Sequence, residues 1–355
     1  MSIEHEVVIG WDIGGAHLKA VTLDSNAEII RCVQLSCPLW QGLQHLERGV
    51  EQVSAGSPAT HHAITMTGEL VDLFANRHEG VIAIANAMAR KLVSKQHYFF
   101  AGEKGFVSLD ECKNNTDHIA SMNWYATGSL VASQVEQALV MDIGSTTTDM
   151  MIVSEGKVCA HGKNDFARMA TDELVYTGLV RTPLMALAQK IFFQGIEVGV
   201  MAEYFATTAD VYRVLGELPE GADQQPAADN GAKTAHASAR RLARMIGRDV
   251  ESASVNEWKN LAQQFADIQL QQLQNACERQ IARGLINASA PMIGAGCGNF
   301  LVRKLAQKLR RPYVDFSKLA DKNSEYNQIL NTCAPAYSVA ALAMNKIHSI
   351  KMSHA

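Results

Sequence analysis

Two short glycine turns with the same spelling constrain this chain more than any other feature. WDIGGAHLKAV begins at Trp11 and MDIGSTTTDMM begins at Met141, so Asp-Ile-Gly-small occurs twice, each time between two apolar strands. A turn between strands needs at most one glycine and no fixed acid. The repeat therefore indicates that the turns at residues 12–15 and 142–146 do the same job.

Turns of this composition are well suited to binding phosphate groups. A glycine-rich turn lets backbone N–H groups converge on a phosphate oxygen, and a carboxylate one step earlier can hold Mg²⁺ through water. We expect Asp12 and Asp142 to be metal-binding and catalytic residues, with Lys19 supplying positive charge. The predicted phosphate-binding residues are Gly14, Gly15, Gly144, Ser145, Thr146 and Thr147. The alternative is a pair of plain hairpin turns.

A third glycine turn lies near the C-terminus, in APMIGAGCGNFLVRKLAQKL. Residues 291–293 read as a strand, 294–298 as a turn and the segment from Asn299 on as a helix, a pattern that can place helix N–H groups beside a nucleotide or diphosphate. We therefore add Gly294, Gly296, Gly298 and Asn299 to the expected ligand-binding residues, as one side wall of a pocket between the first two turns.

The rest of the chain alternates between strand and helix patterns, which predicts an α/β protein with two similar halves. Strands are expected at 7–12, 17–23, 29–35, 62–67, 98–101, 138–142, 148–153 and 157–161, with a helix at 80–93. SVNE at 254–257 is a capping box that opens a long helix, for which Gly284 is a natural stop. Residues 217–233, rich in Pro, Gly, Ala and acids, are expected to form a mobile surface loop, either a passive linker or a substrate lid.

Composition excludes several classes of function. The chain of 355 residues is 47% hydrophobic and 19% charged, and its net charge of −4 offers no footprint for nucleic acid or anionic lipid. Seven scattered cysteines without a CxxC pair are typical of a reducing compartment. The N-terminal MSIEHEVVIG carries acids where a signal peptide needs bases, and no apolar run reaches membrane-spanning length. We expect a cytoplasmic protein.

The set of three turns resembles the actin-like ATPase superfamily, which includes sugar kinases, Hsp70 and actin. This resemblance implies a duplicated, ribonuclease H-like fold in which two lobes clamp phosphates in a central cleft. It implies a first lobe at 1–135, closed by a C-terminal helix at 336–349, and a second lobe at 136–335 with a helical insertion.

Four strings outside the turns carry a closer resemblance. MTGELVDLFANRHEGV, SMNWYATGSLVA, ELVYTGLVRTPL and AEYFATTADVYRVLG are similar to a hydantoinase/oxoprolinase-related family. That family includes tetrahydromethanopterin-linked one-carbon transfer proteins of methylotrophs and an archaeal enzyme of methanofuran biosynthesis. The resemblance implies condensation of aminomethylfuran diphosphate with the phenol of tyramine or glutamyl-tyramine, with release of diphosphate. It also suggests a homodimer. His17 is a departure, because the family more often has Asn there.

Two other functions remain open, because the same phosphate turns would serve an ATP-dependent small-molecule kinase or hydrolase, or a non-catalytic nucleotide sensor. Glu69 is a candidate catalytic base or an acid that complements a helix N-terminus, and Asp149 and Asp172 are further candidates. Arg181 follows a strand and faces either the cleft or a surface acid. Trp124 is expected either to lie in the core between the halves or to stack on a furan or phenol ring.

Overall fold

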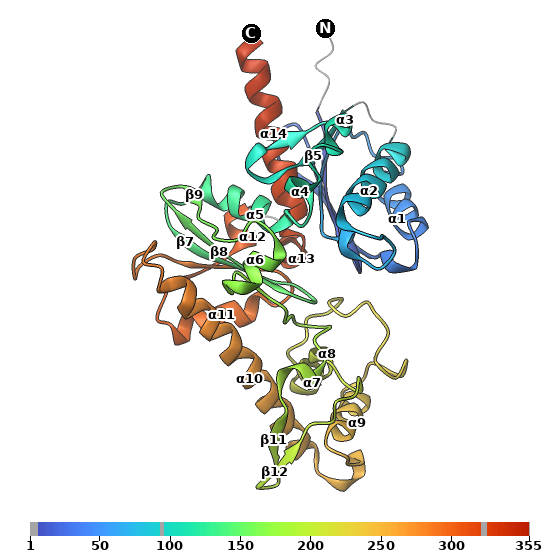
Figure 1. Ribbon diagram of the computed structural model, residues 1–355, viewed down its shortest axis with the longest axis vertical. Helices are drawn as coiled ribbons and strands as arrows, with labels where there is room; N and C mark the ends of the chain where they lie inside the picture. The colour runs from blue at the N-terminus through green and yellow to red at the C-terminus, as the bar shows by residue number, and fades with distance from the viewer. Residues whose placement is uncertain (1–5, 93–95, 321–324, 355) are drawn as a thin grey trace.

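The computed structural model describes residues 6–92, 96–320 and 325–354, with only the backbone of 352–354. Two lobes built on mixed β-sheets lie side by side, and a largely helical extension continues from the second lobe (Figure 1). The α/β class predicted from the sequence is confirmed.

The first lobe contains a six-stranded sheet in the order β3-β2-β1-β4-β5-β6. Its strands are β1 (Val8–Ile13), β2 (His17–Leu23), β3 (Ile29–Ser36), β4 (His61–Met66), β5 (Gln96–Phe100) and β6 (Phe106–Val107). β1 is antiparallel to β2 and parallel to β4. Alternate residues of β1 face opposite cores: Ile9, Trp11 and Ile13 pack under α1 (Gln44–Ser54) and α2 (Arg77–Lys91), whereas Val8 faces the core formed with α14 (Ala334–His354).

Short helices complete this lobe. They are η1 (Leu39–Gln41), η2 (Gly68–Leu70), η3 (Gly102–Lys104), α3 (Leu109–Cys112), α4 (Thr116–Ile119) and α5 (Asn123–Ala132). η2 begins two residues after β4 ends, and α5 contacts both α14 and the second sheet, so these two elements lie next to the cleft.

The second lobe repeats the strand arrangement of the first. Its sheet has the order β10-β8-β7-β13-β14, with β9 on β8, and β7 is antiparallel to β8 and parallel to β13, as β1 is to β2 and β4. The strands are β7 (Ala138–Ile143), β8 (Thr148–Ser154), β9 (Lys157–Val158), β10 (Leu174–Val175), β13 (Met292–Ala295) and β14 (Tyr313–Asp315). The helices with them are α6 (Asp165–Ala170), α11 (Asn299–Lys308), α12 (Phe316–Ala320) and α13 (Asn327–Thr332).

An insertion between β10 and β13 forms the extension at the bottom of Figure 1. It contains α7 (Leu184–Leu187), β11 (Lys190–Phe193), β12 (Ile196–Gly199), α8 (Thr208–Leu215), α9 (Ala235–Met245), η4 (Val250–Ser252) and α10 (Val255–Ile281). α10 begins directly after its N-cap Ser254, which forms a capping box with Glu257, and it ends three residues before Gly284, whose φ of 71° suits the stop.

Residues 217–233 have no regular structure but make specific contacts. Asp223 pairs with Arg213 and Lys233, and Asp229 pairs with Arg241. Gln225 Nε2 donates to Ala16 O and Ser36 Oγ, so this segment reaches the first lobe. Its mobility stays a prediction.

Helix α14 crosses back from the second half to pack on β1, β2 and β4 of the first sheet. Gly10 of β1 makes this close approach possible, because a Cβ atom there would collide with the carbonyl oxygen of Ala336. No helix in the described parts of the chain is both long and apolar enough to cross a membrane.

Several expected elements differ from the structure in their bounds, among them the closing helix expected at 336–349, which spans 334–354, and two differences have a clear local cause. The strand predicted at 157–161 ends at Val158, because the backbone N–H groups of His161 and Gly162 donate to the Glu173 carboxylate instead of to a neighbouring strand. The helix predicted at 80–93 begins earlier, at Arg77, after the Asn76 side chain accepts a cap hydrogen bond; residue 93 lies outside the described residues, as do residues 1–5 of the N-terminal segment.

Candidate functional site

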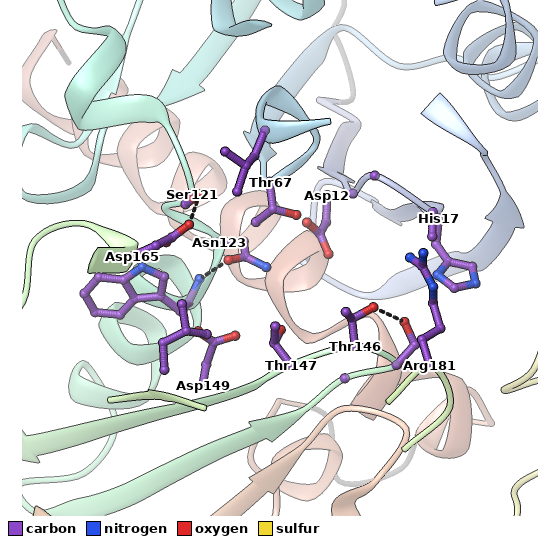
Figure 2. A pocket seen from close by; sticks show the side chains of 18 of the residues that line it. Asp12, His17, Thr67, Ser121, Asn123, Thr146, Thr147, Asp149, Asp165 and Arg181 are labelled. Carbon is purple, nitrogen blue, oxygen red and sulfur yellow. Dashed lines mark hydrogen bonds between the residues drawn. The ribbon is translucent and has the colours of Figure 1, made fainter. Parts of the chain in front are cut away.

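A cavity of about 580 Å³ lies where the two Asp-Ile-Gly turns face each other across the cleft (Figure 2). Nine residues expected from the two motifs line it: Asp12, Gly14, Gly15, Lys19, Asp142, Gly144, Ser145, Thr146 and Thr147. The turns have the same internal geometry, since Gly14 N donates to His17 O and Gly144 N donates to Thr147 O, each at 2.9 Å.

In the first turn, strand pairing brings Asp12 and Lys19 together. The two residues are direct partners in the β1–β2 register, and Lys19 Nζ donates to Asp12 Oδ2 at 3.3 Å. The carboxylate is buried, and its Oδ1 atom has no hydrogen-bond partner among the described residues. A buried oxygen without a partner lowers stability unless a cation or a hydrogen-bond donor binds it, so this oxygen is suited to be a metal ligand.

In the second turn, the position equivalent to Lys19 is an acid. Asp149 is the β8 partner of Asp142 in the register, and it accepts from Arg168 Nη1 at 2.8 Å. Within the described residues Asp142 has no ion-pair partner within 4.0 Å. The pKa of Asp142 is raised to about 7, mainly by burial; the charge of Lys19 opposes the rise, and the charges of Asp149 and Asp12 add to it. Asp142 is therefore the acid of this site that most needs a cation.

The third turn is not a wall of the main cavity, which corrects the expectation for Gly294, Gly298 and Asn299. A Cβ atom on Gly294 would lie 2.8 Å from Tyr313 Oη, and one on Gly298 would lie 2.5 Å from Ile143 Cγ2, so both glycines are covered by packing. The side chain of Asn299 donates to Asp315.

Gly296 and Cys297 of the third turn line a second, small cavity of about 20 Å³, together with residues that include His17, Lys19 and Gly144. That volume holds about one water molecule. The third turn adjoins the second Asp-Ile-Gly turn but leaves no room beside it for a large ligand group.

Glu69 is also not part of the cavity wall. It is fully buried, and its Oε1 atom accepts from Ser121 Oγ at 2.8 Å, while Oε2 has no partner among the described residues. Burial raises the pKa of Glu69 to about 7, against the hydrogen bond from Ser121 and the charge of Arg77. Any influence on a ligand would pass through Ser121, which does line the cavity.

The far end of the cavity combines charged and aromatic groups from both lobes. Arg168 is buried, lies 3.8 Å from the centre of the Trp124 ring and holds Asp149. Asp165 accepts from Arg77 of the first lobe at 2.6 Å and from Ser121 at 3.3 Å. Trp124 is buried, as the core alternative expects, and it also borders the cavity, while its stacking on a furan or phenol ring stays a prediction.

Several lining residues escaped the sequence reasoning. Thr67, Asn123, Asp165 and Arg168 come from three separate segments, since Asp165 and Arg168 share α6. Thr67 and Asn123 fall within two of the family strings, but no local pattern marks any of the four as a cavity residue. The position of Asp149 could be inferred from the sequence, because Asp149 follows Asp142 by seven residues, as Lys19 follows Asp12. The other acid candidate, Asp172, lies outside the cavity lining and pairs with Arg279 on the surface.

No three His, Cys, Asp or Glu side chains in the described portion gather closely enough to hold a metal alone. Mg²⁺ commonly takes one or two carboxylates and completes its shell with water and phosphate oxygens. The unpartnered Asp12 oxygen and the unpaired Asp142 carboxylate fit that pattern.

Two sheets with the same central strand order, with two matching glycine turns facing each other across a cleft, define the actin-like ATPase fold class. Within that class the chain belongs to the hydantoinase/oxoprolinase family, whose sequence model matches residues 61–327.

Two relatives bear the name (4-{4-[2-(gamma-L-glutamylamino)ethyl]phenoxymethyl}furan-2-yl)methanamine synthase. The one from Methanocaldococcus jannaschii is 26% identical over 342 residues, which span 96% of this chain and 98% of the relative. The one from Methanococcus vannielii is 28% identical over 218 residues, spanning 60% of this chain and 94% of the relative.

Among solved structures, nucleotide-free acetone carboxylase matches with a TM-score of 0.56 at 11% identity, covering 95% of this chain and 70% of that one. This likeness supports the fold.

Proposed function

We propose that this protein is a transferase that condenses an aminomethylfuran diphosphate with the phenol of tyramine or glutamyl-tyramine and releases diphosphate. The observation that carries the proposal is the cavity itself, which combines two phosphate-type turns with a nearby aromatic and charged end in one space. The names of the two relatives describe a product in which a phenol oxygen is joined to a furan methylene, the bond that this reaction forms.

The reaction breaks one bond, forms another and moves a proton, and the protein has to assist each change. The bond between the furan methylene carbon and the diphosphate oxygen breaks, with both electrons leaving on the diphosphate. The phenol oxygen forms the new bond to that carbon, and its proton passes to a base. The turns around Gly14, Gly15 and Gly144, with Ser145, Thr146 and Thr147, supply N–H and hydroxyl donors for the leaving diphosphate.

Asp12 and Asp142 would hold Mg²⁺, which would supply positive charge to the departing diphosphate when bound. Lys19, beside Asp12, adds a fixed positive charge to the same region. A phenol has an unperturbed pKa near ~10, so a base must assist at neutral pH. Asp149 lines the cavity, and burial raises its pKa while Arg168 opposes the rise, which makes it the best-placed acid for that role.

An ATP-dependent kinase or hydrolase is the second candidate, because the two turns would hold the phosphates of a nucleotide equally well. The buried third turn argues against it, since the space beside Gly296 takes about one water molecule and no nucleoside. The cytoplasmic location and the homodimer expected from the sequence stay predictions.

The deciding experiment incubates the purified protein and Mg²⁺ with aminomethylfuran diphosphate and either tyramine or glutamyl-tyramine. Release of diphosphate, with the aryl ether detected by mass spectrometry, is the expected result. A parallel reaction replaces the furan diphosphate with ATP. Phosphoryl transfer from ATP without ether formation in the first reaction would reject the transferase and support the kinase.

A further inference from the structure

The end of the cavity where the two turns meet holds an arginine without an acidic partner. Arg181 lines the cavity, and its backbone N–H donates to Ser145 O at 2.8 Å, which ties it to the second turn. Among the described residues its guanidinium has no hydrogen bond or ion pair. Its central carbon Cζ lies 5.4 Å from the centre of the ring of Trp40, a first-lobe residue.

His17 stands opposite this arginine on the first turn, and Figure 2 shows the guanidinium beside the imidazole ring. His17 is buried, and its Nε2 atom has no hydrogen-bond partner among the described residues. Burial lowers the pKa of His17 to about 4, and the charges of Lys19 and Arg181 contribute, so the ring is neutral at physiological pH. A neutral imidazole still donates one N–H bond.

We propose that Arg181 and His17 bind the diphosphoryl group of the ligand from opposite lobes. Arg181 presents a fork of N–H donors that matches phosphate oxygens, and His17 offers one neutral donor from the other side. As the carbon–oxygen bond of the substrate breaks, negative charge grows on the diphosphate, and the guanidinium lies where it can stabilise that charge.

This inference rests on the proposed function for the identity of the ligand, because a nucleotide would offer the same diphosphoryl chemistry. Arg181 could alternatively bind the carboxylate of a glutamyl acceptor, but its position argues against this role. The arginine is tied to the backbone of the second phosphate turn, with Lys19 close to the same imidazole.

The test measures binding of inorganic diphosphate with Mg²⁺ to the full chain by isothermal titration calorimetry. Arg181→Gln is expected to weaken binding about 10- to 100-fold with a native-like melting temperature, because one charge-assisted contact is lost. The diphosphate affinity of Arg181→Lys should lie between those of the unmodified protein and Arg181→Gln, since lysine keeps the charge but lacks the forked pair of N–H donors. His17→Asn should bind better than His17→Ala, because the amide keeps a donor.

Arg279→Gln is the matched control. Arg279 of α10 is 59% exposed and pairs with Asp172, and neither residue lines the cavity, so diphosphate binding should not change. Binding that is the same for Arg181→Gln and Arg279→Gln would overturn the proposal.

A further arm compares steady-state kinetics with tyramine and with glutamyl-tyramine. A rise of KM confined to the glutamyl acceptor in Arg181→Gln, with diphosphate binding intact, would also overturn the proposal, because it would assign Arg181 to the acceptor carboxylate. Binding of ATP but not diphosphate by the unmodified protein, lost in Arg181→Gln, would support the diphosphoryl site while rejecting the transferase.

Discussion

At the scale of single residues, the acids of the cavity differ in how their charge is compensated. Asp12 has Lys19 and Asp149 has Arg168, whereas Asp142 has no ion-pair partner within the described residues. These differences separate residues that the sequence motif treats alike, and they lead to different expectations for the two motif acids.

Asp142→Asn should melt like the unmodified protein or slightly higher, because the change removes an uncompensated charge from the cleft. Asp12→Asn should lower the free energy of unfolding by about 1–3 kcal/mol, because Lys19 loses its partner. Both should reduce turnover at least about 100-fold if they hold Mg²⁺. Thermal melts and assays across a Mg²⁺ titration test this; near-normal turnover in both variants would make the paired acids structural.

Glu69 provides a pH-dependent stability that can be measured without substrate. Its pKa rises from an ordinary value of 4.5 to about 7 in the folded protein, so the folded state binds the proton more tightly than the unfolded state. Its contribution is therefore favourable below about pH 4.5 and is lost as the pH rises toward 7. Glu69→Gln should remove this slope and be more stable than the unmodified protein at pH 8, by on the order of 2–3 kcal/mol.

Urea unfolding at pH 5 and pH 8 measures the effect. The two proteins should differ little at pH 5 and more at pH 8, and parallel pH profiles would show that the Glu69 charge is compensated in some other way.

At the scale of elements, the shape of the second Asp-Ile-Gly turn depends on a glycine outside the motif. A Cβ atom on Gly178 would lie 2.6 Å from backbone atoms of Ser145 and Thr146, so the segment after β10 packs directly against this turn. Leu179 N also donates to Gly144 O at 2.9 Å. The shape of the turn is therefore held from behind as well as by its own sequence.

Gly178→Ala should displace the turn and weaken Mg²⁺–diphosphate binding by at least about tenfold, because its N–H groups no longer converge on the ligand. Gly199→Ala is the matched control, since a Cβ atom at Gly199 has open space and its φ is not in the left-handed region. Calorimetric titration of both variants decides the point, and equal affinities would mean that the turn adapts to the added methyl group.

At the scale of the whole molecule, contacts between residues far apart in the chain fix the position of one lobe relative to the other. Helix α14 lies on the first sheet through the space at Gly10, and Arg77 pairs with Asp165 across the cleft. Gln225 of the insertion reaches Ala16 beside the first turn. The facing of the two turns is a consequence of these contacts.

Gly10→Ala should be strongly destabilising, because its methyl group would collide with the backbone of α14 and not with a flexible side chain. We expect a loss of at least about 3 kcal/mol in the free energy of unfolding, or failure to accumulate folded protein. Differential scanning calorimetry measures the change. A melting temperature equal to that of Gly199→Ala would show that α14 can move away from β1 at little cost.

The sequence by itself determined the features that depend on local chemistry. The Asp-Ile-Gly spelling at both strand ends predicted two turns on one cavity, because glycine, a strand-end acid and hydroxyl residues act within a few positions of each other. Alternating strand and helix patterns and a specific family resemblance predicted the duplicated α/β fold, and both are confirmed.

Only the tertiary structure decided which groups share the cavity and which are covered. The third turn has the composition of a ligand site, yet Tyr313 and Ile143 pack over Gly294 and Gly298. The sequence left Arg181 facing either the cleft or a surface acid, and the fold brings it against Ser145 and across from His17. Burial and the approach of two lobes depend on contacts between segments far apart in the chain, and no local pattern records them.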